Sequence, residues 1–439
     1  MLFAATVTVW FRVALRFGRP AAVTMVAALL LYPAFSALFH RYSSDAITGF
    51  LFALLALALT RSLERPSAGR WAVAGAAIAV IALTRPANQV LVLCALLPLL
   101  AGGRARARLR LTGICALVAI LPLLAWTGAN SIRYDDLALS RGGGGWLPFY
   151  RAYLTDGLVD PANGPASREL AELVERELLP REPYRSYGIT LEKFFQEPSA
   201  RYHEDMISLS DRYWGWDTDY AKLRAAALEG IRRHPFAFAA DVARSGLHQL
   251  TESWALLPAP VQARVSATQE TVVVGDRELP RPTEGGPIPA ASRSHWLARP
   301  DNAFDEVWTS PTDHHVVATR PELLRDFDRL NERVAELSLP AAWSGWFDGA
   351  RALNRLNRLY PPALVWLAVG LVAIAVRRPA RAGLALALAG AALAVIAATL
   401  LSVPPVAEFL LPLFPAFALL GIAGLLGPRR DPEVREEYA

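Results

Sequence analysis

The sequence predicts a mainly α, polytopic α-helical membrane protein whose central part forms a mostly helical extracytoplasmic domain. Of its 439 residues, 53% are hydrophobic and only 19% are charged, whereas soluble globular chains average about 25% charged residues. The apolar residues are concentrated in blocks at the two ends of the chain, and the middle has the composition of a soluble domain. These observations exclude a purely soluble enzyme, a disordered chain and a collagen-like or repeat protein.

About nine apolar segments are expected to lie in the membrane, because a spanning helix needs about 20 apolar residues and at least about 17. Lipid offers no water to backbone polar groups, so each segment is expected to be helical. Two of the segments are short and are compatible with a hairpin around Thr84-Arg85-Pro86 that does not fully cross. The nine segments are 1–17, 20–40, 45–61, 71–84, 87–101, 111–128, 361–376, 381–402 and 405–426.

Arginines on alternate connections indicate the orientation, because arginine-rich loops stay on the cytoplasmic side. These arginines are Arg16, Arg19, Arg61, Arg65, Arg70, Arg104, Arg106, Arg108, Arg110, Arg377, Arg378, Arg381, Arg429 and Arg430. The connections 41–45, 84–88, 129–358 and 402–406 should therefore face outward. The net charge of +5 is then mainly a topology signal and does not indicate nucleic acid as a partner.

The predicted organisation is membrane helices over 1–128, an extracytoplasmic domain over 129–358, membrane helices over 361–426 and a charged cytoplasmic tail over 427–439. Within the central domain, apolar spacing predicts helices over 166–179, 220–249 and 320–337, with a break in the second at His234-Pro235. A hairpin is expected over 270–279, and 343–360 resembles an interfacial helix. Eight of the twelve tryptophans lie in this domain, where packing is a more common role for them than stacking on sugars.

Two ionisable residues at the outward ends of membrane segments are the main candidates for function. Asp45 lies at the start of a predicted span, just after the segment that begins with Arg41. An ionisable residue within a membrane segment is usually retained for function. The alternative is that the Asp45 side chain caps the helix. The guanidinium of Arg85 could bind a phosphate through two hydrogen bonds. The alternative role for Arg85 is an arginine that extends its charged group to the membrane interface without binding a ligand.

Other clusters are weaker candidates. The segment 201–220 combines carboxylates, His203 and tryptophans, with the triplet Asp217-Thr218-Asp219, and suits a sugar or divalent-ion site; a solvated acidic loop is the more common origin of such a pattern. His314-His315 is better explained as a surface pair, and Gly142–Gly145 as a flexible loop. The two cysteines, Cys94 and Cys115, lie in apolar runs, which excludes a disulfide-stapled domain and a Cys-ligated metal site.

The order of several motifs resembles the bacterial GT-C class of integral-membrane glycosyltransferases, particularly relatives of protein O-mannosyltransferase and lipid A aminoarabinose transferase. The motifs are Leu31-Tyr32-Pro33 leading to Ser44-Asp45, then Ala82-Leu83-Thr84-Arg85-Pro86, then Trp126, Asn130 and Arg133, and finally Glu408-Phe409 with Pro412 and Pro415. The resemblance covers 1–130 and 360–426 and is poor in the central domain. Glu408 stands where the family has an arginine.

The resemblance implies transfer of a sugar from a polyprenyl-phosphate donor to a cell-envelope acceptor on the outer face of the plasma membrane. It implies that Asp45 assists at the donor phosphate or at a metal and that Arg85 lies near the same cavity. The expected substrate-binding residues are Asp45, Arg85, Arg41 and Glu408. A divalent metal could take part, but no set of ligands in the sequence indicates one. No other cofactor is expected. The family's general base lies in a first outer loop that would correspond to sequence upstream of Met1, and the orientation likewise predicts a missing upstream helix.

Two other hypotheses belong to different classes. One is a non-catalytic, degenerate paralogue whose outer domain binds a glycan or a protein partner. The other is a transporter, which the scarcity of charged residues inside the spans and the lack of paired broken helices disfavour.

Overall fold

The computed structural model describes residues 1–40, 43–100, 103–135, 137–140, 143–181, 184–185, 188–215, 218, 220–254, 271–274, 277–280, 304–308, 314–318, 329, 333 and 349–429. The chain divides into two compact units. Unit 1 comprises residues 1–141, 242–257 and 353–439, and unit 2 comprises residues 142–241 and 258–352. The predicted central domain, 129–358, thus differs from unit 2 at both boundaries, and the segment 242–257 groups with the apolar helices.

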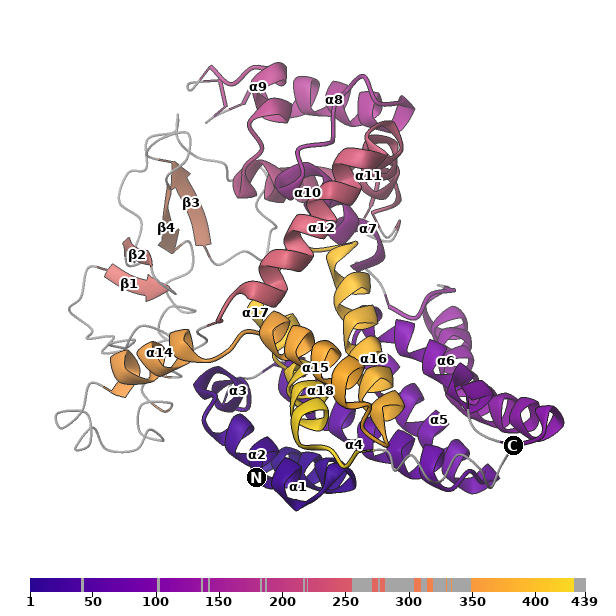
Figure 1. The fold of residues 1–439 in the computed structure, drawn as a ribbon. Helices are drawn as coiled ribbons and strands as arrows, with labels where there is room; N and C mark the ends of the chain where they lie inside the picture. Colours follow the sequence, from indigo (N-terminus) through magenta and orange to yellow (C-terminus); the bar gives the residue numbers. More distant parts are fainter. Residues whose placement is uncertain are drawn as a thin grey trace. The chain divides into compact units, whose positions relative to one another are not determined.

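The described part of unit 1 consists of helices (Figure 1), most of them apolar; α14 is the amphipathic exception. In chain order they are α1 (Leu2–Ala14), η1 (Leu15–Phe17), α2 (Arg19–Leu30), α3 (Pro33–Leu38), α4 (Ser44–Glu64), α5 (Ala68–Ala82), η2 (Pro86–Leu100), α6 (Ala105–Tyr134), the end of α12 (Pro235–Thr251), α14 (Gly349–Leu359), α15 (Ala363–Arg377), α16 (Ala382–Leu400), α17 (Ala407–Leu410) and α18 (Phe414–Leu426). Prolines in the first turn start α2, α3 and α18, where a missing N–H costs nothing.

Helix α18 forms the centre of this unit. Every residue from Phe414 to Gly424 is buried, as expected for a helix that is apolar on all faces. Glycines allow α15 to approach it closely: a Cβ added at Gly370 would lie 2.7 Å from Leu420, and one added at Gly421 would lie 2.6 Å from Trp366. Small residues at such crossings are typical of helix pairs in membranes.

Four apolar runs in the described residues are long enough to cross a membrane: Ser44–Glu64, Ala105–Tyr134, Ala352–Arg377 and Ala382–Leu400. The third run combines parts of α14 and α15, which are separated at 360–362. The helices Arg19–Leu30, Ala68–Ala82, Pro86–Leu100 and Phe414–Leu426 are apolar but shorter than a bilayer requires. The structure therefore supports several membrane helices, and the full set of nine stays a prediction.

Loops that were predicted to share the cytoplasmic side meet at one end of unit 1. Arg16, which follows α1, forms an ion pair with Glu64 at the end of α4, at 3.0 Å, and Arg381 before α16 lies 3.8 Å from the same carboxylate. Ala380 N–H also donates to the carbonyl of Pro428, at 2.9 Å. The helices thus place these segments together, and the side of the membrane that they face stays a prediction.

Unit 2 is mainly helical. Its helices are α7 (Gly143–Tyr150), the π-helical turn η3 (Arg151–Thr155), α8 (Pro165–Glu177), α9 (Leu191–Gln196), α10 (Ala200–Tyr213), α11 (Ala221–Arg233) and the start of α12. The predicted break is confirmed, because α11 ends at Arg233 and α12 begins at Pro235. An aromatic core that includes Phe149, Tyr153 and Phe194 joins the helices.

The described residues of unit 2 also include two antiparallel hairpins. In the first, β1 (Thr271–Val274) pairs with β2 (Arg277–Pro280), which confirms the hairpin predicted over 270–279. In the second, β3 (Phe304–Trp308) pairs with β4 (His314–Ala318). The amphipathic helix predicted over 320–337 lies almost wholly outside the described residues. Helix α14 confirms that the later part of 343–360 is helical, and its position at a membrane interface stays a prediction.

Candidate functional site

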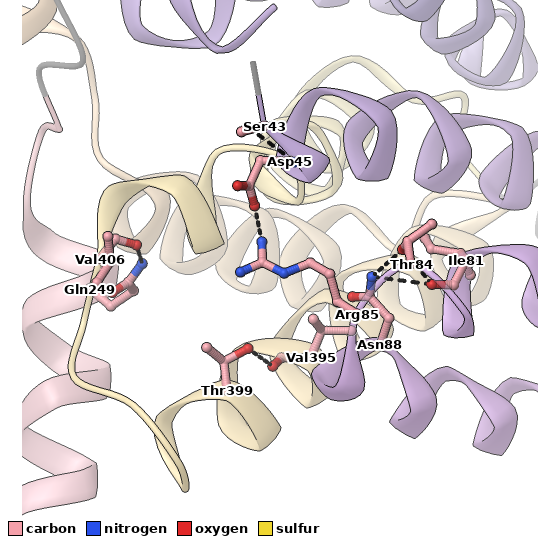
Figure 2. A network of polar contacts seen from close by, with 10 residues as sticks. All are labelled: Ser43, Asp45, Ile81, Thr84, Arg85, Asn88, Gln249, Val395, Thr399 and Val406. Atoms are coloured by element: carbon pink, nitrogen blue, oxygen red, sulfur yellow. Dashed lines mark hydrogen bonds and ion pairs between the residues drawn. The ribbon is translucent and has the colours of Figure 1, made fainter. Parts of the chain in front are cut away.

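The two leading sequence candidates, Asp45 and Arg85, lie next to each other in unit 1 (Figure 2). Asp45 is in the first turn of α4, and Arg85 is in the turn that separates α5 from η2. The Arg85 guanidinium donates a hydrogen bond to the Asp45 carboxylate, and the two form an ion pair. The side chain of Asp45 is 8% exposed and that of Arg85 is 20% exposed, so both charges are largely withdrawn from solvent.

The local structure shows that Asp45 is not the N-cap of α4. The N-cap of α4 is Ser43, whose hydroxyl oxygen accepts a hydrogen bond from the backbone N–H of Asp45 at 3.2 Å. The cap is therefore supplied by a neighbouring serine, and the Asp45 carboxylate is directed to Arg85. A carboxylate in the first turn of a helix is also stabilised by the helix dipole.

The turn that carries Arg85 is fixed by side-chain hydrogen bonds. The Asn88 amide donates to the hydroxyl of Thr84 at 3.0 Å and to the carbonyl of Ile81 at 3.3 Å, and the Thr84 hydroxyl donates to the same carbonyl at 2.6 Å. Asn88 is fully buried. These bonds hold the backbone of Arg85 in place, so the guanidinium approaches Asp45 from a rigid base.

Helix α17 contributes an aromatic ring and a second carboxylate. The guanidinium carbon of Arg85 lies 4.4 Å from the centre of the Phe409 ring, which is a cation–π distance. Glu408 lies close enough to interact electrostatically with Arg85. The structure thus brings Asp45, Arg85 and Glu408 together, from three segments far apart in the sequence. Phe409 belongs to one of the motifs in the sequence, but it was not predicted as a site residue.

Gln249 holds the segment that precedes α17. Its amide donates to the carbonyl of Val406 at 2.7 Å, and its side chain is buried. The carbonyl oxygen of the Gln249 side chain is also buried and accepts no hydrogen bond from the described residues. No sequence motif pointed to Gln249, because a single glutamine near the end of a long helix has no distinctive pattern.

The other sequence candidates are either not described by the structure or have different partners in it. Arg41, Asp217 and Asp219 lie outside the described residues. Trp126 and Asn130 instead donate hydrogen bonds to the chain after α6, at the carbonyls of Leu139 (3.1 Å) and Ala138 (2.9 Å). Their role in the structure is to fix the end of that helix.

His203 is buried in unit 2 among aromatic rings. Its ring centre lies 4.8 Å from that of Tyr150, 5.8 Å from that of Phe149 and 6.2 Å from that of Trp146. Burial lowers the pKa of His203 to about 4, so the imidazole is neutral at pH 7. Aromatic packing, and not an acidic loop, is therefore the environment of this residue.

The residues present do not make a metal site by themselves. Within the part of the chain that the structure describes, no group of three or more His, Cys, Asp or Glu side chains is arranged to hold an ion. Near Arg85 there are two carboxylates, Asp45 and Glu408, and the first is already bound to the guanidinium.

Comparison of the chain with protein-family models, with curated proteins and with solved structures gave no match.

Proposed function

We propose that the protein is a membrane glycosyltransferase that takes a sugar from a polyprenyl-phosphate donor and passes it to an acceptor at the outer face of the plasma membrane. The observation that carries this proposal is the buried Asp45–Arg85 ion pair. Ionisable residues within membrane helices are costly and are retained mainly for function. The resemblance of the motifs around both residues to the GT-C class supplies the type of reaction.

Arg85 is the residue proposed to bind the donor phosphate. Its guanidinium presents paired N–H groups that match two oxygens of a phosphate. Phe409 and the rigid turn orient it, so binding requires little rearrangement of the arginine. Asp45 accepts a hydrogen bond from the guanidinium when no phosphate is bound. When phosphate binds, some of the guanidinium N–H groups donate to the phosphate instead of to Asp45.

The charges near Arg85 place a condition on this proposal. Two carboxylates, Asp45 and Glu408, lie near Arg85, and negative charge at the site would repel an anionic phosphate. The proposal therefore includes a second cation. Arg41 precedes Asp45 by four residues in the sequence, and we infer that it supplies this charge.

In the proposed reaction, the bond from the anomeric carbon of the sugar to the phosphate oxygen breaks, and a bond to the acceptor hydroxyl oxygen forms. The arginines stabilise the negative charge that develops on the leaving phosphate. The acceptor hydroxyl gives its proton to a carboxylate base. The resemblance assigns that base to no residue of the sequence in hand.

The test uses the full chain in lipid nanodiscs, with binding of a polyprenyl phosphate measured by native mass spectrometry. We expect Arg85→Gln and Arg41→Gln each to weaken binding at least about tenfold, because a charged contact contributes about 1.5–3 kcal/mol. Arg378→Gln is the matched control, because Arg378 is exposed and belongs to a connection predicted to lie on the opposite side of the membrane. Equal binding by all variants would refute the proposed phosphate site.

A second measurement separates the enzyme from a binding protein. Membranes that contain the chain are given a polyprenyl-phosphate sugar with a radiolabel, and we expect transfer to envelope material that Asp45→Asn abolishes. Wild-type turnover by Asp45→Asn would remove Asp45 from the site. Binding of the lipid without any transfer would favour the alternative, a non-catalytic paralogue.

A further inference from the structure

An apolar groove runs between α4 and α5, at the opposite end of α4 from Asp45. The cavity has a volume of about 700 Å³. Its lining residues are Leu51, Leu54, Leu57 and Ala58 from α4, and Gly69, Val73, Ala76, Ala77 and Val80 from α5, together with Arg61 and Arg70. All polar side chains of the lining are therefore arginines, and both lie at the end where α4 finishes and α5 begins.

The arginine end of the groove is suited to an anion. Arg70 is oriented by a hydrogen bond from its guanidinium to the carbonyl of Arg65, at 2.8 Å. No carboxylate of the described residues forms an ion pair with Arg61 or Arg70, so none of these carboxylates neutralises the two guanidinium groups. The first turn of α5 also lies here, and a Cβ added at Gly69 would contact nothing within 4 Å, so the turn is open to a ligand. The start of a helix favours a phosphate through its N–H groups and its dipole.

The length of the groove corresponds to one leaflet of a bilayer. From Gly69 to Val80, α5 rises about 16 Å at 1.5 Å per residue. The hydrocarbon core of a bilayer is about 30 Å thick, so one leaflet is about 15 Å. A molecule that fills the groove therefore has an apolar chain of about this length and a negative group at one end.

We propose that this groove binds an anionic phospholipid, with an acyl chain between α4 and α5 and the phosphate at Arg61 and Arg70. The positive charges of Arg61 and Arg70 favour an anionic phospholipid. A lipid without net charge would make the same apolar contacts but would gain less from the arginines. The arginines belong to a loop predicted to be cytoplasmic, so the lipid belongs to the inner leaflet. Basic pockets on that side of a membrane are suited to anionic headgroups. The arginine end of the groove lies about 24 Å along α4 from Asp45, by the rise between residues 45 and 61. The proposed lipid site does not depend on the proposed transferase activity.

The experiment uses the full chain purified in detergent, with phosphatidylglycerol and phosphatidylcholine of the same acyl chains added back. Native mass spectrometry measures the affinity for each lipid. We expect phosphatidylglycerol to bind at least about tenfold more tightly than phosphatidylcholine. The double variant Arg61→Gln/Arg70→Gln should remove this preference, whereas the control Arg104→Gln/Arg106→Gln on the predicted same side should keep it.

A second pair of variants tests the groove itself. Ala76→Trp should fill the groove and reduce binding of both lipids at least about tenfold, and Val80→Trp should do the same if the first variant does not fold. Leu117→Trp, on the exposed face of α6, is the control and should have no effect. Equal affinity of the wild-type chain for the two lipids would overturn the proposal. Binding that Ala76→Trp and Val80→Trp leave unchanged would also overturn it, as would a mass that shows a second copy of the chain in place of lipid.

Discussion

Arg85 donates a hydrogen bond to Asp45 across 40 positions of the sequence, and both side chains lie within the apolar unit of the protein. Breaking a buried ion pair by removing one partner leaves an uncompensated charge, and this typically costs about 3–5 kcal/mol. The pair is therefore a stability element of unit 1 as well as the centre of the candidate site.

The first prediction is a double-mutant cycle on this pair. Asp45→Asn and Arg85→Gln should each lower the unfolding temperature of the full chain in detergent, and the double variant should lose less than the sum of the two. The expected coupling is about 1–3 kcal/mol. The control pair Arg16→Gln and Glu64→Gln is more exposed, at 40% and 21%, and should couple by less than about 1 kcal/mol. Additive losses for Asp45 and Arg85 would contradict the pairing.

The relation between Asp45 and Arg85 was only partly predictable from the sequence. The alternation of arginines predicted that both residues lie on the same side, because it orders the loops without reference to packing. It did not predict that Arg85 would contact Asp45 and Phe409, because such contacts depend on how helices pack across hundreds of residues. The cap of α4 was ambiguous for a local reason: Ser43, Ser44 and Asp45 are all good capping residues.

Helix lengths were also difficult to predict. Hydropathy marks where the chain is apolar but not where a helix stops, and Gly18 and Pro33 interrupt the apolar region that includes α1, α2 and α3. Asn88 and Gln249 carry no motif at all. Their importance arises from the backbone groups they satisfy, which only the folded arrangement defines.

The second prediction concerns the crossing of α15 and α18. Gly370→Ala should destabilise the protein, because the new Cβ would lie 2.7 Å from the Leu420 side chain and 2.9 Å from its carbonyl oxygen. Gly383→Ala is the matched control, because nothing lies within 4 Å of its Cβ position and alanine favours a helix by about 1 kcal/mol. Thermal unfolding should move in opposite directions for the two variants. A gain of stability in Gly370→Ala would show that the helices do not cross there.

The third prediction concerns the start of α8. Helix α8 has no side-chain cap of its own at Gly164. The Glu229 carboxylate, from α11, instead accepts hydrogen bonds from the N–H groups of Ala166 (2.9 Å) and Ser167 (2.8 Å). Glu229→Gln should cost about 1 kcal/mol of stability, as the loss of a cap does. The control Glu172→Gln, on the exposed side of α8, should be neutral, and equal losses would contradict the role of Glu229.

The same contact predicts an effect of pH. Burial raises the pKa of Glu229, but the hydrogen bonds from Ala166 and Ser167 outweigh it, so the net shift of the pKa is downward. A lowered pKa means that the carboxylate stabilises the fold above the ordinary glutamate pKa of 4.5, and that this stability is lost as the pH falls further. Glu229→Gln should therefore weaken the acid sensitivity of unfolding below about pH 4.5.

The fourth prediction is a loss of stability in mild acid through His203. Its pKa is about 4 in the folded protein against 6.5 for an ordinary histidine, so the unfolded chain binds the proton more tightly. Stability should thus fall as the pH drops from about 6.5 to about 4, and by pH 5 the loss should be about 2 kcal/mol. His203→Phe should remove this part of the pH dependence. His248→Phe, at a half-exposed histidine, is the control and should retain it.

The last prediction tests the orientation on which the proposed function depends. The native cysteines, Cys94 and Cys115, are buried, so a cysteine introduced at an exposed position can be labelled selectively. Glu175, on α8 of unit 2, and Arg106, at the start of α6, are both exposed. In intact cells a membrane-impermeant maleimide should label Glu175→Cys, because the positive-inside pattern places unit 2 outside. Arg106→Cys should react only after the membrane is permeabilised. The reverse pattern would place Asp45 and Arg85 on the cytoplasmic side and would rule out transfer at the outer face.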